Sequence, residues 1–334
     1  MGLITSYMGN GVYGTDVAGG ATGLQASFND ILAAEVITNF EVNNKLEGKY
    51  MYKTIKGANT VSFPTASNGT VEFVKVGDKA TMRKTTHGTR KIGLDDYLVG
   101  NVTIYDADVA AEGYDHATAD VKNVGVAMAQ SHEQRLIVNL LAAARGKDNV
   151  GDTGVSAGNS DITAELIAGY SAITTFSAKG ISMTNALSGM KIKFDNLRVP
   201  EKGRYFICPS QVYTSIVNNL TNINSLYAGA GSIAEGNVVK LMGFELINSA
   251  EFGVNQVDVN GDYMQTEKFG VAGTNLTLGI CFTAEAIAHV SLIDVQIEDE
   301  RDASSASTTK YIRKLVGYGI LRNDRAGEVK ESIV

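Results

Sequence analysis

The stretch from Tyr114 to Arg145 constrains the fold more than any other part of the chain, because it predicts one unusually long helix. Its apolar residues recur at steps of three, four or eight, so they fall on one stripe of an α-helix: Val121, Val124, Met128, Leu136 and Leu140. About thirty residues at ~1.5 Å each give a rod of roughly 45 Å. We therefore expect a spine, residues 114–145, on which the other elements pack.

Both ends of this predicted spine are marked by residue type. Asp115 and Asp120 lie near its start, and Arg135 and Arg145 lie near its end, which is the arrangement that the helix dipole favours. Gly146 follows directly and predicts a left-handed stop.

Composition indicates an ordinary globular protein and argues against a surface built to bind nucleic acid. The 334 residues are 44% hydrophobic and 19% charged, with a net charge of -7 and a pI near 5.2. No apolar run is long enough for a membrane span, and the N-terminus lacks a secretion signal, so we expect a cytosolic protein. Cys208 and Cys281 sit in apolar strand-like runs and are interpreted as buried small hydrophobic residues in a reducing compartment.

The region before the spine predicts an arm and a projecting hairpin. Residues 1–23 have no periodicity, and the short helix face that follows is formed by Phe28, Ile31 and Leu32 with Val36 and Phe40. Residues 59–65 and 69–76 alternate apolar with polar, and Asn68-Gly69 between them predicts a tight turn.

A basic flank follows this hairpin and has almost nothing apolar to anchor it: Lys79, Arg83, Lys84, Arg90 and Lys91. A two-stranded ribbon alone is marginally stable in water, so we expect it to lie on a neighbouring copy. Candidate partners there are the acids Glu298, Asp299 and Glu300. Simple solvation of the flank and contact with DNA remain open as alternatives.

After the spine the pattern predicts an α/β plate and a terminal strand pair. A helix within 183–200 places Leu187, Met190 and Phe194 on one face, and a strand at 204–209 and a helix through Val212, Ile216 and Leu220 follow. Strands are predicted at 243–248, at 254–271 with a turn at Asn260-Gly261, and at 276–282. Residues 292–300 alternate strictly, and 310–322 can pair beside them.

This order of elements resembles the major capsid protein fold of tailed phages named for phage Hong Kong 97. Its short sequence motifs are similar to those of the capsid proteins of T-seven-like podoviruses, the autographivirus type. The residues that carry the resemblance are Ile92, Leu94, Asp95, Leu98, Val102, Ile104, Tyr105 and Asp106; Val199, Pro200, Arg204, Phe206, Cys208, Pro209 and Tyr213; Met242, Gly243, Phe244 and Glu245; and Gly319, Leu321, Arg322, Ala326 and Gly327.

The resemblance implies an α+β chain with named parts: an N-terminal arm (1–49), an E-loop (50–95), a P-domain with the spine (96–181), an A-domain (182–284) and a return to the P-domain (285–334). It further implies hexamers and pentamers that form an icosahedral phage head around double-stranded DNA. A portal at one vertex is implied, and a cement or decoration protein is compatible. Because only about 27 residues precede Phe28, we expect a separate scaffolding protein. Assembly in the cytoplasm of the host bacterium and residence in the virion capsid follow from the same resemblance.

Other chemistry is poorly supported by the residues. Residues 9–14 match GxGxxG, but no strand precedes them and no helix pattern follows, so an oxidoreductase stays a remote alternative. Residues 258–267 place glycine and glutamate at the wrong positions for a calcium loop. The histidines are scattered singly, and we interpret His132 as a packing residue of the spine. We therefore predict no catalytic, cofactor or metal site, and we keep an encapsulin-type compartment shell as the alternative function.

Overall fold

The computed structural model describes residues 34, 36–40, 44–55, 57–66, 72–79, 81, 87–94, 96–107, 116–146, 165–219, 240–252 and 277–332. Several predictions fall outside these residues: the arm contacts Phe28, Ile31 and Leu32, the basic residues Arg83 and Lys84, the turns at Asn68-Gly69 and Asn260-Gly261, and the motifs at 9–14 and 258–267.

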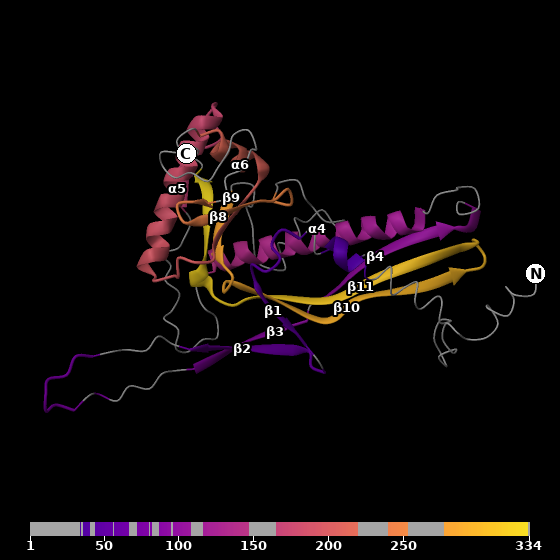
Figure 1. Cartoon of the computed structure of the whole chain (residues 1–334), viewed down its shortest axis with the longest axis horizontal. Coiled ribbons are helices and arrows are strands. Elements are labelled where there is room, and N and C mark those ends of the chain that lie inside the picture. The colour runs from indigo at the N-terminus through magenta and orange to yellow at the C-terminus, as the bar shows by residue number, and fades with distance from the viewer. Residues whose placement is uncertain are drawn as a thin grey trace, which may run out of the picture. The chain divides into compact units, whose positions relative to one another are not determined.

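The described elements are α+β, as predicted (Figure 1). The helices are α4 (His116–Arg145), α5 (Phe176–Asn196), α6 (Ser210–Val217) and the short 3-10 helix η4 (Asn323–Arg325). The strands are β1 (Met51–Thr54), β2 (Thr60–Ala66), β3 (His87–Gly93), β4 (Asp96–Tyr105), β5 (Glu165–Ala168), β6 (Arg204–Cys208), β7 (Lys240–Leu241), β8 (Phe244–Asn248), β9 (Thr277–Thr283), β10 (Ile287–Asp302), β11 (Ser307–Ile320) and β12 (Ala326–Ser332).

The chain divides into two units. Unit 1 is formed by Met1–Asn44, Asp96–His132 and Leu292–Val316, and unit 2 by Lys45–Asp95, Glu133–Ser291 and Gly317–Val334. Helix α4 and strands β10 and β11 run from one unit into the other, so the sequence alternates between the units several times. The predicted pairing of the terminal strands is confirmed, because β10 and β11 are neighbours in the sheet order β1-β10-β11-β4.

In unit 1 the first half of α4 packs against β4, the last strand of the sheet β1-β10-β11-β4. Strand β4 pairs antiparallel with β11, with Tyr97 opposite Leu315. Gly100 of β4 lies so close to α4 that a Cβ there would meet Val124 Cγ1 at 2.3 Å. His132 is fully buried, with its ring centroid 5.2 Å from that of Phe40, which confirms its predicted role as a packing residue.

The spine is confirmed as the continuous helix α4, but the predicted reason for its end is wrong. Gly146 is not among the residues with positive φ, and its N–H donates to the carbonyls of Ala142 and Ala143. A close neighbour favours a small residue there, because a Cβ on Gly146 would lie 2.5 Å from Asn323 Nδ2 and that side chain would have to shift. The sequence pattern at a helix end does not distinguish these two causes.

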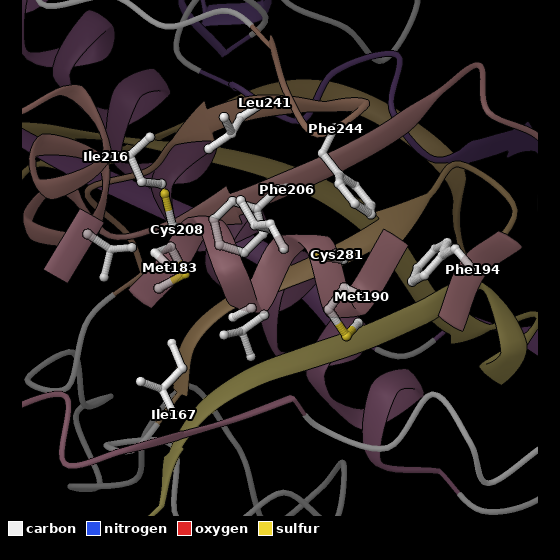
Figure 2. Packing of buried hydrophobic residues seen from close by; sticks show 14 of the residues in the cluster. Ile167, Met183, Met190, Phe194, Phe206, Cys208, Ile216, Leu241, Phe244 and Cys281 are labelled. Atoms are coloured by element: carbon white, nitrogen blue, oxygen red, sulfur yellow. The ribbon is translucent and has the colours of Figure 1, made fainter. Parts of the chain in front are cut away.

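In unit 2 the predicted α/β plate is a mixed six-stranded sheet with order β5-β12-β9-β6-β8-β7. Helix α5 presents Met183, Leu187, Met190 and Phe194 to a core that also holds Phe206 of β6 and Phe244 of β8 (Figure 2). Helix α5 begins at Phe176, earlier than the pattern predicts. Strand β12 was not predicted in this sheet, where it lies between β5 and β9.

The two cysteines belong to this core, as predicted. Cys208 and Cys281 are both free and fully buried. Burial raises the pKa of both thiols well above the usual value, so they stay protonated and unreactive.

Two polar clusters anchor the second half of α4 within unit 2. Arg145 donates from Nε and Nη2 to the carboxylate of buried Glu328 at 2.8 and 2.7 Å, and Thr277 Oγ1 donates to the same group. Glu133 accepts from Ser249 Oγ and from the backbone N–H of Lys45. Both ends of this half of the helix are therefore hydrogen-bonded to the residues around it.

Candidate functional site

The projecting hairpin is the first part of the candidate site, and its strand pairing corrects the prediction. Strand β2 pairs with β3 over Thr60↔Gly93 to Ala66↔His87, whereas residues 72–75 are not in a strand. The predicted pairing of 59–65 with 69–76 around Asn68-Gly69 is therefore wrong. A local turn signal was outweighed by Phe63 and Ile92, whose buried side chains give β2 and β3 one apolar face.

The stem of the hairpin, which we define as β2 and β3, is anchored to its own chain. Arg90 Nε donates to the carbonyl of Ile320 at 3.1 Å. A Cβ on Gly319 would lie 2.7 Å from the side chain of Ile92, and a Cβ on Gly317 would lie 2.2 Å from the carbonyl oxygen of Gly93. The expectation that the ribbon lacks any support in its own subunit is therefore wrong for the stem.

The tip of the hairpin, which we define as residues 72–79, behaves differently. All of its residues are exposed, and Phe73 and Val76 have no side-chain area covered. A turn closes it, with Gly77 at φ 100° and the Asp78 N–H donating to the Lys75 carbonyl. The sequence pattern predicted a strand here, whereas the segment presents exposed apolar side chains among two lysines, Lys75 and Lys79, and two acids, Glu72 and Asp78.

The acids that were predicted to receive the basic flank lie on β10 in unit 1, and each has a partner on β11. Glu298 pairs with Arg313, and the hydrogen bond to Glu300 raises the pKa of Tyr311. Asp299 pairs with Lys310 at 2.9 Å, and this lysine is 6% exposed. Glu298 and Glu300 are exposed.

Of the remaining residues that were predicted to contact another copy, some are exposed and one is hydrogen-bonded within its own chain. Lys79 and Lys91 are exposed, while Arg90 is engaged by the Ile320 carbonyl. Contact of any of these residues with another copy stays a prediction.

Strand β4 has an exposed apolar face that was not predicted from the sequence. Its side chains alternate between the α4 side and an open face, on which Tyr97, Val99 and Tyr105 are 54%, 51% and 48% exposed. The signal was present as a run without a charged residue from Tyr97 to Tyr105. Beyond the end of this strand, Arg301 holds the Asp106 carboxylate with both terminal nitrogens, which lowers the pKa of Asp106.

Within the described residues, no group of three or more histidine, cysteine, aspartate or glutamate side chains is arranged to hold a metal ion. Among the helices in those same residues, none combines the length and apolar character that crossing a membrane requires. The features that stand out are therefore surfaces: the hairpin tip, the acidic strand β10 and the apolar face of β4.

Comparison of this sequence with known protein families and with individual proteins finds similarity to phage capsid proteins. The family model of the Gp10A-like proteins, described as major capsid protein, matches residues 63–330. The major capsid protein of Escherichia phage T7 is 22% identical over 317 residues, which cover 91% of each chain. The major capsid protein of Enterobacteria phage T3 is 20% identical over 316 residues, again 91% of each chain.

Solved structures share the fold. The capsid of Cyanophage P-SCSP1u aligns with a TM-score of 0.70 and 25% identity, over 85% of this chain and 87% of that one. The mature capsid of bacteriophage PhiM1 aligns with a TM-score of 0.66 and 14% identity, over 86% and 87%. A virus-like particle from Pyrococcus furiosus shares the fold alone, at 0.52 and 10%, over 91% and 99%.

These findings confirm the Hong Kong 97-type capsid fold that the residues resembled, and they favour a phage capsid over a cellular compartment. Because the family model spans far more than half of the sequence, the chain belongs to the Gp10A-like family of phage major capsid proteins.

Proposed function

We propose that this chain is the building block of a closed icosahedral phage head, assembled from hexamers and pentamers around double-stranded DNA. The family is structural, and no catalytic step is part of the proposal. The observation that carries it is the contrast within the hairpin, whose stem is anchored in its own chain while Phe73 and Val76 at the tip are fully exposed. Such a tip is suited to lie on a second copy.

Apolar burial supplies most of the proposed contact. Covering one side chain such as Phe73 or Val76 contributes about 1.5–3 kcal/mol. Each tip therefore contributes several kcal/mol, and every subunit of a shell repeats the contact. A free monomer gains nothing from these side chains.

Charge sets the orientation of the contact and contributes less energy. Lys75 and Lys79 are exposed beside the apolar tip, and we propose Glu298 and Glu300 of a second copy as their partners. Exposed ion pairs contribute ~0–1 kcal/mol each, and Arg313 already occupies Glu298 in its own chain. Asp299 is no longer a good candidate, because releasing it would leave buried Lys310 without its carboxylate.

Other partners follow from the function of a shell. We propose a separate scaffolding protein during assembly in the host cytoplasm, a portal at one vertex, and room for a cement or decoration protein. The shell would enclose the DNA without specific recognition, and the net charge of -7 supports this because the chain lacks the lysine and arginine excess that phosphate binding requires.

Replacing residues 67–86 by a two-residue turn tests this proposal, because β2 and β3 are already paired at Ala66↔His87 and a short turn can close them. We expect a soluble subunit with native far-UV circular dichroism and no shells by sedimentation and electron microscopy. As a control, Asp78→Ser changes an exposed polar residue of the tip and should leave shell yield unchanged. Normal particles from the shortened hairpin would refute the proposed role of the tip.

A further inference from the structure

Strand β4 is an unprotected sheet edge. It ends the order β1-β10-β11-β4, so among the described residues no strand pairs with its second side. Exposed edges are normally blunted by short length, charge or proline, because an open edge invites another strand. Residues Tyr97–Tyr105 contain no charge and no proline.

The edge strands of the six-stranded sheet and the outer part of β10 are blunted, in contrast to β4. In the six-stranded sheet the edge strands are β7, with two residues, and β5, with four. Beyond the segment paired with β1, strand β10 carries Glu298, Asp299, Glu300 and Arg301. Strand β4 has 10 residues and three exposed large apolar side chains.

Residues 97–105 of β4 have a similar pattern in both directions, with identical residues at their two ends and related residues at most positions between them. From Tyr97 to Tyr105 it reads YLVGNVTIY, with Asn101 at the centre. If two copies of this strand run antiparallel about Asn101, Tyr97 lies opposite Tyr105, Val99 opposite Thr103, and Leu98 opposite Ile104. Opposite residues of an antiparallel pair point to the same face, so every apolar residue on the open face keeps a compatible neighbour.

We propose that β4 pairs antiparallel with β4 of a second copy, about a two-fold axis through Asn101. This inference rests on the proposed function, since a shell subunit meets other copies of itself. The pairing completes the backbone hydrogen bonds of the open edge and joins the two sheets into one. The strand complements itself, so the occupant is another copy and no second protein is required.

The surroundings of β4 fit an approach along the edge. One face of the strand is occupied by α4, as the contact of Gly100 with Val124 shows, while the opposite face and the outer edge are open among the described residues. One residue beyond the apolar run, the same register sets Asp96 opposite Asp106 of the second copy. Arg301 already binds that Asp106 and reduces the repulsion.

Cysteine cross-linking in assembled shells tests the register. Opposite Cα atoms in an antiparallel pair lie about 4.5–5.5 Å apart, which suits a disulfide. Asn101→Cys is expected to give a covalent dimer on oxidation, and so is the double change Val99→Cys with Thr103→Cys. Val99→Cys alone or Thr103→Cys alone should stay monomeric, because the same residue in the second copy lies roughly 14 Å away along the strand. Native Cys208 and Cys281 are buried and do not compete.

Shells of Asn101→Cys that give only monomer on a non-reducing gel would overturn the pairing and leave the proposed shell function intact. A ladder of larger covalent species would also overturn it, because a two-fold contact links copies only in pairs.

Where a cysteine change prevents assembly, charge variants keep the proposal testable. Val99→Lys with Thr103→Lys opposes like charges at two places, whereas Val99→Lys with Thr103→Glu opposes unlike charges. We expect at least a tenfold loss of shells from the first and recovery with the second. Equal yields from the two variants would contradict the pairing.

Discussion

Glu133 shows how a single residue couples pH to stability. Glu133 is 2% exposed, and its carboxylate accepts hydrogen bonds from Ser249 and Lys45. Burial raises the pKa of Glu133 above its usual value, and the hydrogen bonds from Ser249 and Lys45 only partly offset that effect. A raised carboxyl pKa means that stability from protonated Glu133 is present below the unfolded-state pKa and is lost as the pH rises through the folded-state value.

We therefore predict that Glu133→Gln gains stability relative to the native chain as the pH rises. Glutamine keeps one carbonyl oxygen that can accept from the Lys45 N–H, its amide nitrogen can donate to Ser249 Oγ once that hydroxyl rotates, and the buried charge is removed. Urea unfolding of dissociated subunits between about pH 4 and pH 8 measures the difference. Glu133→Ala should instead lose ~1–3 kcal/mol by leaving the donors unsatisfied. A difference between the glutamine variant and the native chain that shrinks with rising pH would contradict this account.

Gly100 is a second residue whose role can be tested. A Cβ at this position would meet Val124 of α4 at 2.3 Å, so Gly100→Ala should cost about 1–3 kcal/mol through overpacking. Gly93→Ala is the matched control, because its Cβ would meet nothing closer than 3.8 Å. Thermal unfolding of both variants provides the comparison, and equal melting temperatures would show that α4 and β4 do not pack as described.

Sequence alone predicted the residues whose roles depend on burial and missed those that depend on distant neighbours. Burial of Cys208, Cys281 and His132 followed from apolar runs and helical spacing. The requirement for glycine at position 100 depends on Val124, which periodicity along one strand does not reveal.

Elements with strong internal periodicity were predicted well. Helix α4 repeats apolar residues at helical spacing, and β6 is a short apolar run before a proline, so both follow from local pattern. The single stripe describes only part of α4, because residues 136–144 are buried on every side. The prediction of the hairpin pairing was wrong because it relied on Asn68-Gly69, which is a local turn signal. The observed partner of β2 is β3, and the apolar face that the two strands share also buries Ile92. Strand β12 was missed for a related reason, since its neighbours β5 and β9 are far away in sequence.

The anchor at the end of α4 provides a prediction for this element. Arg145→Met would leave Glu328 buried without its cation, and we expect a loss of about 3 kcal/mol, at the low end for a buried pair because Arg145 is partly exposed. The double change Arg145→Met with Glu328→Leu should recover part of that loss. Urea unfolding of the single and double variants gives the coupling energy. Additive losses would show that the pair contributes no coupling to stability.

At the scale of the whole molecule, the account predicts that tip residues affect assembly and not folding. Phe73→Ser with Val76→Ser removes apolar side chains that contact nothing in the monomer, so the free energy of unfolding should stay unchanged. The concentration needed for shell formation should rise at least ~100-fold, from the loss of several kcal/mol of burial per contact. Light scattering during assembly measures this, with Lys75→Ser as a matched variant of smaller effect. An unchanged threshold would mean that other surfaces supply the assembly energy.

The most direct test of the central claim, that a second copy covers the hairpin tip, is an electron cryo-microscopy map of shells formed by the full chain with its scaffold. The account predicts density for residues 72–79 seated on a neighbouring subunit, with Phe73 and Val76 buried in that contact. A map in which the tip folds back on its own chain, or stays in solvent in every subunit position, would contradict it.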